Sequence, residues 1–218
     1  GVEYLVASRA IAVGGQLLTI QGLHDTYDEI FLPLHGKHQA ANAASALVAV
    51  EAFFGDQPLD IEAVRAGFAA VTSPGRCEVV HRDPTVILDA AHNPHGAKAL
   101  AQTLKSEFNF DEIVAVVGVF GDKDALGILQ ELGPIVDHVI VTQSSSSRAM
   151  SSSDLEKLAT SVFGNDRVFE VKDLHTALDR AVGDATRPLS EDTVGIIVTG
   201  SVVTVGEART YLRKKFAK

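Results

Sequence analysis

Residues 85–96 read TVILDAAHNPHG, a short apolar run followed at once by polar residues, a proline and a glycine. The run at 85–88 is typical of a buried strand. Beyond Pro94, apolar side chains recur at helical spacing, at Ala97, Leu100, Ala101 and Leu104. The polar cluster therefore lies at a turn from a strand into a helix. Ligands of open α/β sheets bind at such turns, so this stretch indicates both a fold class and a candidate site.

The chain on either side of this stretch alternates between strand-like and helix-like segments. Strands are predicted near 78–82, 85–90, 112–119, 138–142, 168–171 and 194–199. Helices are predicted near 95–107, 124–132, 154–163, 174–184 and 205–216. The alternation predicts an α/β fold with a mostly parallel sheet and helices on both faces. Only Asp83 and Pro84 separate the first two strands, too few residues for a parallel crossover, so the first strand is predicted to run antiparallel.

The 154–163 helix has start and stop signals of its own. Ser153 and Glu156 fit a capping box before its first apolar residue, Leu155. Gly164 follows as the predicted end of the helix.

The first part of the chain follows a different pattern. Residues 2–34 alternate apolar and polar side chains around Gly14-Gly15 and predict antiparallel strands joined by a hairpin turn. An alanine-rich helix should follow from Lys37 and end at Gly55, with a shorter helix near 61–71. The sequence TSPGR at 72–76 breaks both regular structures. We therefore predict two parts, 1–73 and 74–218.

The composition excludes several classes of protein. The chain has 218 residues and is 46% hydrophobic, enough for a real core, so disorder is excluded. Its formal charge is −9, and no cluster of Lys and Arg interleaved with aromatic residues is present, so we expect no nucleic-acid partner. There is no signal peptide or membrane-length apolar run, and the single cysteine, Cys77, has no partner for an internal disulfide. A cytoplasmic location is expected. The chain starts abruptly in strand-like sequence without Met, which we interpret as a fragment.

Four predicted strand ends carry polar or glycine-rich turns, at 89–95, 118–124, 142–148 and 198–209. Parallel strands bring their carboxyl ends to one edge of a sheet, so these turns could converge on one site. Each also has a purely structural interpretation. Asp89 could cap the following helix, the glycines in GVFGDKD (118–124) could turn the chain, and the serines in TQSSSSR (142–148) could form a flexible loop.

Other chemistries find little support in the sequence. The pairs His35/His38 and His92/His95 have a spacing seen in metal sites, but Pro94 lies inside the second pair and no cysteine joins them, so we expect no metal ligands. No G-x-S-x-G motif is present, and Glu78 next to Cys77 should raise the pKa of the thiol. Neither GVFGDK nor HGKHQ fits a nucleotide-binding glycine motif, so this part alone should not cradle a triphosphate.

The order of short motifs along the chain is more specific than any one of them. LPLHGKHQAANAASAL (32–47), PGR (74–76), ILDAAHNPHG (87–96), GVFGDKD (118–124) and VTGSVVTVGEAR (198–209) follow one another. This series resembles the C-terminal half of the folylpolyglutamate synthase/dihydrofolate synthase family of muramyl-type ligases. The resemblance implies a Rossmann-like C-terminal domain at 74–218, preceded at 1–73 by the truncated tail of the central ATP-binding ligase domain.

The resemblance also implies a reaction. Members of that family transfer the γ-phosphate of ATP to a folate or dihydropteroate carboxylate, and the amine of L-glutamate then attacks the acyl phosphate. ATP and Mg²⁺ are the implied cofactors. The phosphate-binding loop, the magnesium ligands and the carbamylated lysine belong to the half that the chain does not contain, so the fragment alone is expected to be inactive. The implied full-length protein is a cytoplasmic monomer with small-molecule partners and no membrane partner.

Seven residues match positions to which the family gives a role. Asn42 resembles the contact to adenine, Arg76 the contact to the phosphates, and Asp89 the contact to the ribose hydroxyls. The implied glutamate-binding set is His92, Asn93, Lys123 and Ser201. Within it, His92 and Lys123 are the implied catalytic residues. The chemistry fits, because a guanidinium bonds phosphate oxygens, a carboxylate accepts hydroxyl protons, and an ammonium pairs with the carboxylates of glutamate.

The chain departs from the family pattern at one motif. Val202-Val203 stands where the family often has Leu-Tyr, so a hydroxyl that could hold substrate is missing. Two other interpretations remain open at this point: a muramyl-type ligase with another acceptor, and a binding module without catalytic activity.

Overall fold

The computed structural model of the chain describes residues 5–55, 57–186 and 193–217. It divides into two compact units, Gly1–Ser73 and Pro74–Lys218, and each is described by itself. The predicted strand segment at 2–34 begins outside the described residues, because residues 2–4 are not among them.

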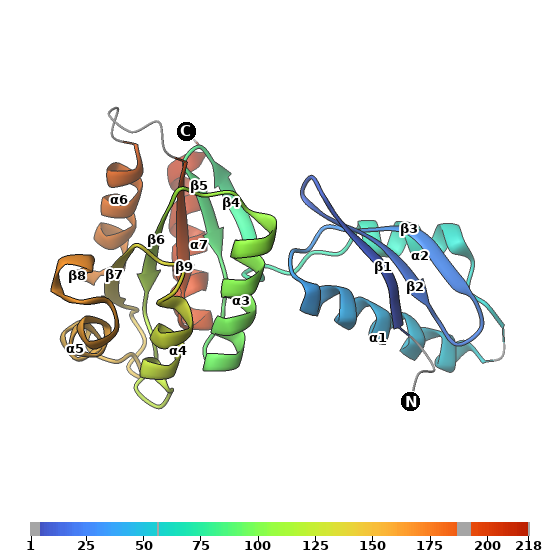
Figure 1. Cartoon of the computed structure of the whole chain (residues 1–218), viewed down its shortest axis with the longest axis horizontal. Helices are drawn as coiled ribbons and strands as arrows, with labels where there is room; N and C mark the ends of the chain where they lie inside the picture. Colours follow the sequence, from blue (N-terminus) through green and yellow to red (C-terminus); the bar gives the residue numbers. More distant parts are fainter. Residues whose placement is uncertain (1–4, 56, 187–192, 218) are drawn as a thin grey trace. The chain divides into compact units, whose positions relative to one another are not determined.

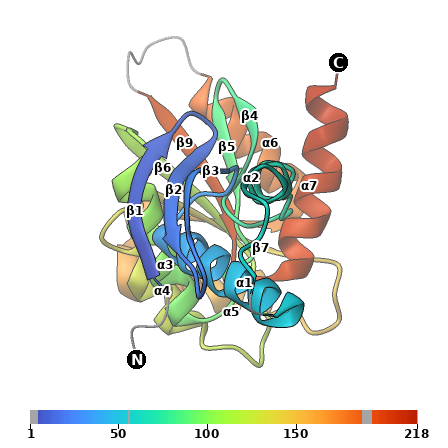
Figure 2. The same ribbon diagram turned by 90° about the vertical axis from the view of Figure 1, so that its right-hand side faces the viewer.

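The first unit is a three-stranded antiparallel sheet with two helices. The strands pair in the order β1 (Leu5–Ala12), β2 (Gly15–Gln21) and β3 (Thr26–Leu32), and the predicted hairpin turn at Gly14-Gly15 is confirmed. The helices are α1 (Lys37–Phe54) and α2 (Ile61–Ala69), which ends two residues earlier than expected. Figure 2 shows both helices on one side of the three strands. On that side Leu18 and Ile20 of β2 pack against Ala43 and Leu47 of α1, as the period of two predicts.

A buried carboxylate holds α1 to the turn between β2 and β3. Glu51 is fully buried, and its oxygens accept hydrogen bonds from the Leu23 N–H (2.7 Å) and the Tyr27 hydroxyl (2.8 Å). Buried charges are stable only with such partners. The position of α1 on the sheet is thereby fixed by polar as well as apolar contacts.

The second unit contains a six-stranded sheet in the order β4-β5-β9-β6-β7-β8. Its strands are β4 (Glu78–Arg82), β5 (Thr85–Leu88), β6 (Glu112–Val117), β7 (His138–Gln143), β8 (Val168–Asp173) and β9 (Val194–Thr199). All neighbours are parallel except β4 and β5, so the predicted mostly parallel sheet and its antiparallel first strand are confirmed. The last strand, β9, lies between β5 and β6, where Ile196 pairs with both Val86 and Val114.

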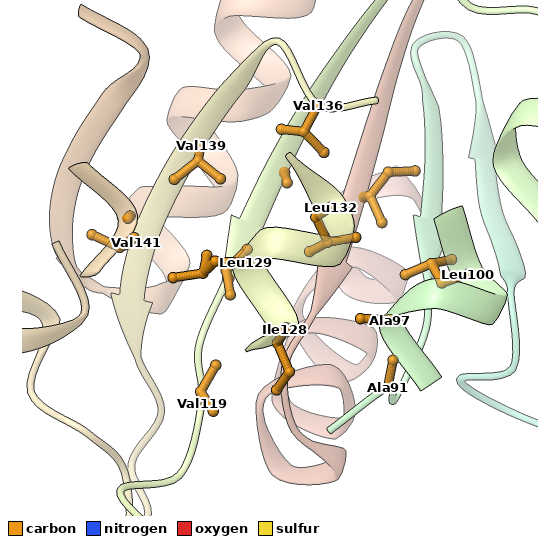
Figure 3. Close-up of a cluster of buried hydrophobic side chains, with 14 of the residues drawn as sticks. Ala91, Ala97, Leu100, Val119, Ile128, Leu129, Leu132, Val136, Val139 and Val141 are labelled. Carbon is orange, nitrogen blue, oxygen red and sulfur yellow. The ribbon is translucent and has the colours of Figure 1, made fainter. Parts of the chain in front are cut away.

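Helices cover both faces of this sheet, as Figure 1 shows. The helices α3 (Pro94–Glu107), α4 (Ala125–Leu132) and α5 (Ser152–Phe163) pack on one face, and α6 (Leu174–Ala185) and α7 (Val202–Phe216) on the other. A 3₁₀ turn at Asn165–Arg167 leads into β8. Successive residues of β5 alternate between the two cores: Ile87 faces the first and Val86 and Leu88 the second. In Figure 3, Ile128, Leu129 and Leu132 of α4 lie in the first core.

The predicted capping box of α5 is wrong. The N-cap is Ser151, whose Oγ accepts a hydrogen bond from the Asp154 N–H (3.2 Å). Ser153 lies inside the first turn, because the helix begins two residues earlier than the apolar pattern indicated. Ser152 is buried there and donates a hydrogen bond to Glu170 of β8 (2.6 Å). The predicted end at Gly164 is confirmed, with a φ of 81° that suits glycine.

Candidate ligand site at the carboxyl edge of the parallel sheet

Three of the four predicted turns meet above the centre of the sheet. Gly118 N–H donates to Thr199 O (3.1 Å), and Gly200 N–H donates to Ala91 O (3.0 Å). These bonds join the turns after β6, β9 and β5. The contact is close: Gly200 has a φ of 108°, and a Cβ there would lie 2.7 Å from Gly118 O. Only glycine allows the two backbones to approach in this way.

The fourth turn, the serine loop at 142–148, is bound to its neighbours rather than free. Gly121 N–H donates to Arg148 O (2.9 Å), and the Arg148 guanidinium lies 2.9 Å from Asp122 Oδ2. At its other end, Ser145 N–H and Oγ donate to the Glu207 carboxylate of α7. The four turns thus converge as predicted, and the serine loop is bonded to its neighbours at both ends.

Asp89 joins two segments through one buried carboxylate. The residue is 7% exposed, and its carboxylate oxygens accept hydrogen bonds from Cys77 N–H (2.8 Å) and Ala91 N–H (2.9 Å). Burial raises the pKa of Asp89 above its ordinary value, while the two N–H groups and the charge of Arg76 oppose that shift. Asp89 does not cap α3. That role belongs to Asn93, whose Oδ1 accepts a hydrogen bond from Gly96 N–H (2.8 Å).

The other two residues matched to nucleotide contacts are exposed and lie in different units. Arg76 is in the turn that precedes β4, close enough to Asp89 for its charge to act on that carboxyl. Asn42 lies on α1 of the first unit, where its amide donates to Gln39 Oε1 (3.2 Å). Six of the seven candidate residues therefore belong to the second unit.

Two of the residues matched to glutamate contacts have polar groups available for a ligand. His92 Nδ1 lies 3.0 Å from Ala90 O. Because a carbonyl oxygen only accepts, this contact requires the hydrogen on Nδ1, and in the tautomer with the hydrogen on Nδ1 the Nε2 atom is an acceptor. Lys123 is partly exposed, and its Nζ lies 3.5 Å from Asp122 Oδ2, a carboxylate that Arg148 already pairs with. The Lys123 ammonium is therefore only partly neutralised.

The side chains of Asn93 and Ser201 are used as helix caps. Ser201 is 1% exposed, accepts a hydrogen bond from Thr204 N–H (3.0 Å) and donates one to Thr204 Oγ1 (2.8 Å). Thr204 in turn donates to Gly118 O (3.0 Å). Ser201 thus holds the start of α7 against the turn after β6. The sequence assigned no role to Thr204, although the polar run VTGS before a helical pattern is a signal for such a cap.

Cys77 is buried, and burial raises the pKa of its thiol, with smaller contributions from Asp89 and Glu107. The predicted cause, the charge of Glu78, is wrong because that carboxylate is directed to Arg209 instead (2.9 Å). Among the residues that the structure describes, no three or more His, Cys, Asp or Glu side chains are grouped to hold a metal ion. No helix in the described part of the chain is long and apolar enough to cross a membrane.

The chain is similar to known proteins in both sequence and fold. Residues 75–202 match the family described as Mur ligase, glutamate ligase domain. The dihydrofolate synthase/folylpolyglutamate synthase of Mycobacterium tuberculosis is 52% identical over 95% of this chain, which covers 45% of that protein. The Escherichia coli protein of the same name is 35% identical over 84% of this chain and 39% of its own length. The chain thus spans less than half the length of these relatives.

Solved structures agree in fold. The Mycobacterium tuberculosis folylpolyglutamate synthase complexed with ADP and AMPPCP superposes with a TM-score of 0.91, at 54% identity, over 96% of this chain and 48% of that one. The bifunctional folylpolyglutamate synthase/dihydrofolate synthase of Yersinia pestis, complexed with AMPPNP and Mn ion, gives a TM-score of 0.72 at 28% identity, over 97% of this chain and 46% of that one. With a family match that covers more than half of its residues, the chain belongs to the Mur ligase family and carries that family's glutamate ligase domain.

Proposed function

We propose that the chain is the C-terminal part of an ATP-dependent ligase that adds L-glutamate to folates, or to dihydropteroate as well. In this proposal residues 1–73 are the end of the central ATP-binding domain and residues 74–218 are the glutamate ligase domain. The full-length protein would act as a cytoplasmic monomer on small-molecule substrates. The identity to the Mycobacterium tuberculosis protein supports this branch of the family over muramyl-peptide ligases.

The observation that carries the proposal is the double hydrogen bond of Asp89. One oxygen holds the turn that contains Arg76, and the other holds the loop that contains His92. A ligase of this type must bring a nucleotide and an amino acid to one reacting carboxylate, and a shared buried acceptor fixes the two loops relative to each other. In the proposal Arg76 binds the phosphates, Asp89 lies at the ribose, and Asn42 contacts the adenine.

The chemistry proceeds in two steps. The γ-phosphoryl group of ATP passes to the folate carboxylate, which gives an acyl phosphate and ADP. The glutamate nitrogen then attacks the acyl carbon, the C–N bond forms, and the C–O bond to phosphate breaks. The attacking nitrogen must first lose a proton. In the proposal His92 Nε2 accepts it, and the contact of Nδ1 with Ala90 O supports this role because it favours the tautomer in which Nε2 is an acceptor. Lys123 pairs with a carboxylate of the incoming glutamate.

Transfer of the γ-phosphoryl group of ATP in this family needs a divalent cation. The described residues include no cluster of acidic or histidine side chains that would supply its ligands. The proposal therefore assigns Mg²⁺ to the portion of the relatives that this chain does not span.

Steady-state kinetics of a full-length protein that contains this chain would test the proposal. With ATP and L-glutamate, folate or dihydropteroate should support phosphate release, and nucleotide-sugar peptides should not. Lys123→Ala should raise the glutamate KM and leave the ATP KM unchanged, while Arg76→Ala should do the reverse.

The matched control is Lys98→Ala, which removes an exposed lysine from α3, and both KM values should stay unchanged. Turnover with nucleotide-sugar acceptors alone would overturn the choice of substrate. An unchanged glutamate KM in the Lys123 variant would remove this lysine from the site.

A further inference from the structure

The turn that carries Arg76 has an unusual backbone. Gly75 has a φ of 69° and Cys77 a φ of 48°, in a region that residues with a Cβ rarely adopt. Arg76 lies between these two residues, so the position of its backbone depends on this conformation. Such a conformation persists only where surrounding contacts hold it.

Three hydrogen bonds within the second unit hold this turn in place. Gly75 O accepts from Ala90 N–H (2.8 Å), and Cys77 N–H donates to Asp89 (2.8 Å). The third bond is from Gly75 N–H to Glu78 Oε2 (2.9 Å). Gly75 also lies against α7, because a Cβ at this position would be 2.9 Å from Val205 Cγ1.

Glu78 in turn is held by an arginine from the far end of the sequence. The Arg209 Nε lies 2.9 Å from both carboxylate oxygens of Glu78, and Arg213 lies 3.6 Å away. The Glu78 and Arg209 side chains are 19% and 26% exposed, so water screens this pair less than a surface pair. Arg209 closes the VTGSVVTVGEAR motif, and the site described above gives it no contact with substrate.

We propose that Glu78 and Arg209 are positioning residues for Arg76. The ion pair fixes the Glu78 carboxylate beneath Gly75 N–H, and this fixes the turn that presents the Arg76 guanidinium to the nucleotide phosphates. The inference rests on the proposed function for the role of Arg76, while the mechanical link itself depends only on the contacts in the second unit. In this proposal Glu78 and Arg209 act on nucleotide binding only through Arg76.

The mechanical link can be tested on the 218-residue chain by amide hydrogen exchange. Arg209→Met should speed exchange at Gly75 and Cys77 by about tenfold or more, because the Glu78 acceptor loses its anchor. Lys215→Met is the matched control. It removes a partly exposed cation and an ion pair, to Asp179, from the same helix without touching Glu78. Unchanged exchange at Gly75 in the Arg209 variant would overturn the link.

The functional link is tested by kinetics in a full-length protein that contains this chain. Arg209→Met and Glu78→Gln should each raise the ATP KM about five- to tenfold and leave the glutamate KM unchanged. Arg209→Lys keeps the charge and should recover part of the loss. In an Arg76→Ala background, Arg209→Met should add no further rise, because the residue it positions is already gone.

If Arg209 had a purely structural role, the effects of Arg76→Ala and Arg209→Met on the ATP KM would multiply, and the glutamate KM would change as well. That result would overturn the proposal. Failure of the proposed function and failure of the positioning role give different results. If the wild-type protein ligates no glutamate, the proposed function is wrong, whereas a normal wild-type enzyme with an unchanged ATP KM in both variants rejects the positioning role alone.

Discussion

Asp89 connects residues that are distant in the sequence, and its two hydrogen bonds make it a support of the site as well as a candidate ligand of ribose. Sequence patterns placed Asp89 at a strand end and predicted a site there. They did not predict its bond to Cys77, because that bond depends on the unusual backbone of the turn at Gly75 and Cys77 as well as on the antiparallel pairing of β4 and β5. The same limit applies to Arg209 and Glu78, whose contact depends on where α7 packs.

Asp89→Asn should therefore affect stability and nucleotide binding together. An amide has one acceptor oxygen, so one of the two N–H groups loses its partner. We expect a decrease of about 1–3 kcal/mol in the free energy of unfolding of the chain, measured by urea denaturation.

In a full-length enzyme Asp89→Asn should also raise the ATP KM and spare the glutamate KM. A rise in the glutamate KM alone would contradict the ribose assignment.

Cys77 should be unreactive in the folded chain. Burial raises the pKa of its thiol, and the thiolate is the reactive form, so alkylation at about pH 8 should proceed only after unfolding. At a pH above the ordinary pKa of 9.0, the thiol loses its proton in the unfolded state but keeps it in the folded state. The free energy of unfolding should thus fall as the pH rises above about 9.

Mass spectrometry after iodoacetamide treatment, with and without urea, measures the alkylation. Rapid labelling of the native chain would contradict the burial of the thiol.

At the scale of the elements, local signals predicted the helices and strands of the second unit well. The polar turns after apolar strands, the antiparallel first strand and the glycine after α5 were all readable, because they depend on neighbouring residues. The start of α5 was misplaced because both Ser151 and Ser153 can cap a helix, and the choice depends on Ser152 reaching Glu170 of β8. The partners of the serine loop were not predicted for the same reason, since they come from α7 and from the turn after β6.

Two glycines in the second unit should respond in opposite ways to alanine. Gly200 has a positive φ and no room for a Cβ beside Gly118 O, so Gly200→Ala should cost about 1–3 kcal/mol. Gly183 lies inside α6 and is exposed, and a methyl group added there would meet no atom within 4 Å. Gly183→Ala should therefore stabilise the chain by about 0.5–1 kcal/mol.

Thermal or urea unfolding of the two variants measures both values. Equal effects of the same sign would contradict the tight approach of the turns after β6 and β9.

For the whole molecule, the proposed division of labour predicts a folded but inactive chain. In the proposal the phosphate-binding loop and the metal ligands belong to the part of the relatives outside this chain, and Arg76 is the one phosphate contact assigned within it. The chain alone should therefore neither hydrolyse ATP nor ligate glutamate. Association costs an estimated 4–15 kcal/mol of rigid-body freedom, so the remaining contacts should give millimolar affinity at best. Calorimetry with Mg-ATP and a phosphate-release assay are the measurements. Micromolar binding or turnover would mean that the chain contains a complete site.

The first unit should be the less stable part in this form. Within it, β1 is an edge strand with no fully buried side chain, and among the described strands it pairs only with β2. Hydrogen exchange should be fastest in β1 and slowest in β5, β9 and β6, where the cores of both sheet faces meet. Stronger protection in β1 than in β9 would contradict this order.

The central position of β9 has a consequence for biosynthesis. Until β9 takes its place between β5 and β6, the sheet consists of two separate groups of strands, β4-β5 and β6-β7-β8, because β9 is the strand that joins them. A ribosome delivers the chain N-terminus first, at about 5–20 residues per second, so β5 and β6 wait for several seconds with open edges. Open edges are templates for wrong pairing. The second unit therefore completes its sheet only after β9 has been translated, and a nascent chain stalled before Val194 would present two unpaired edges to chaperones and proteases.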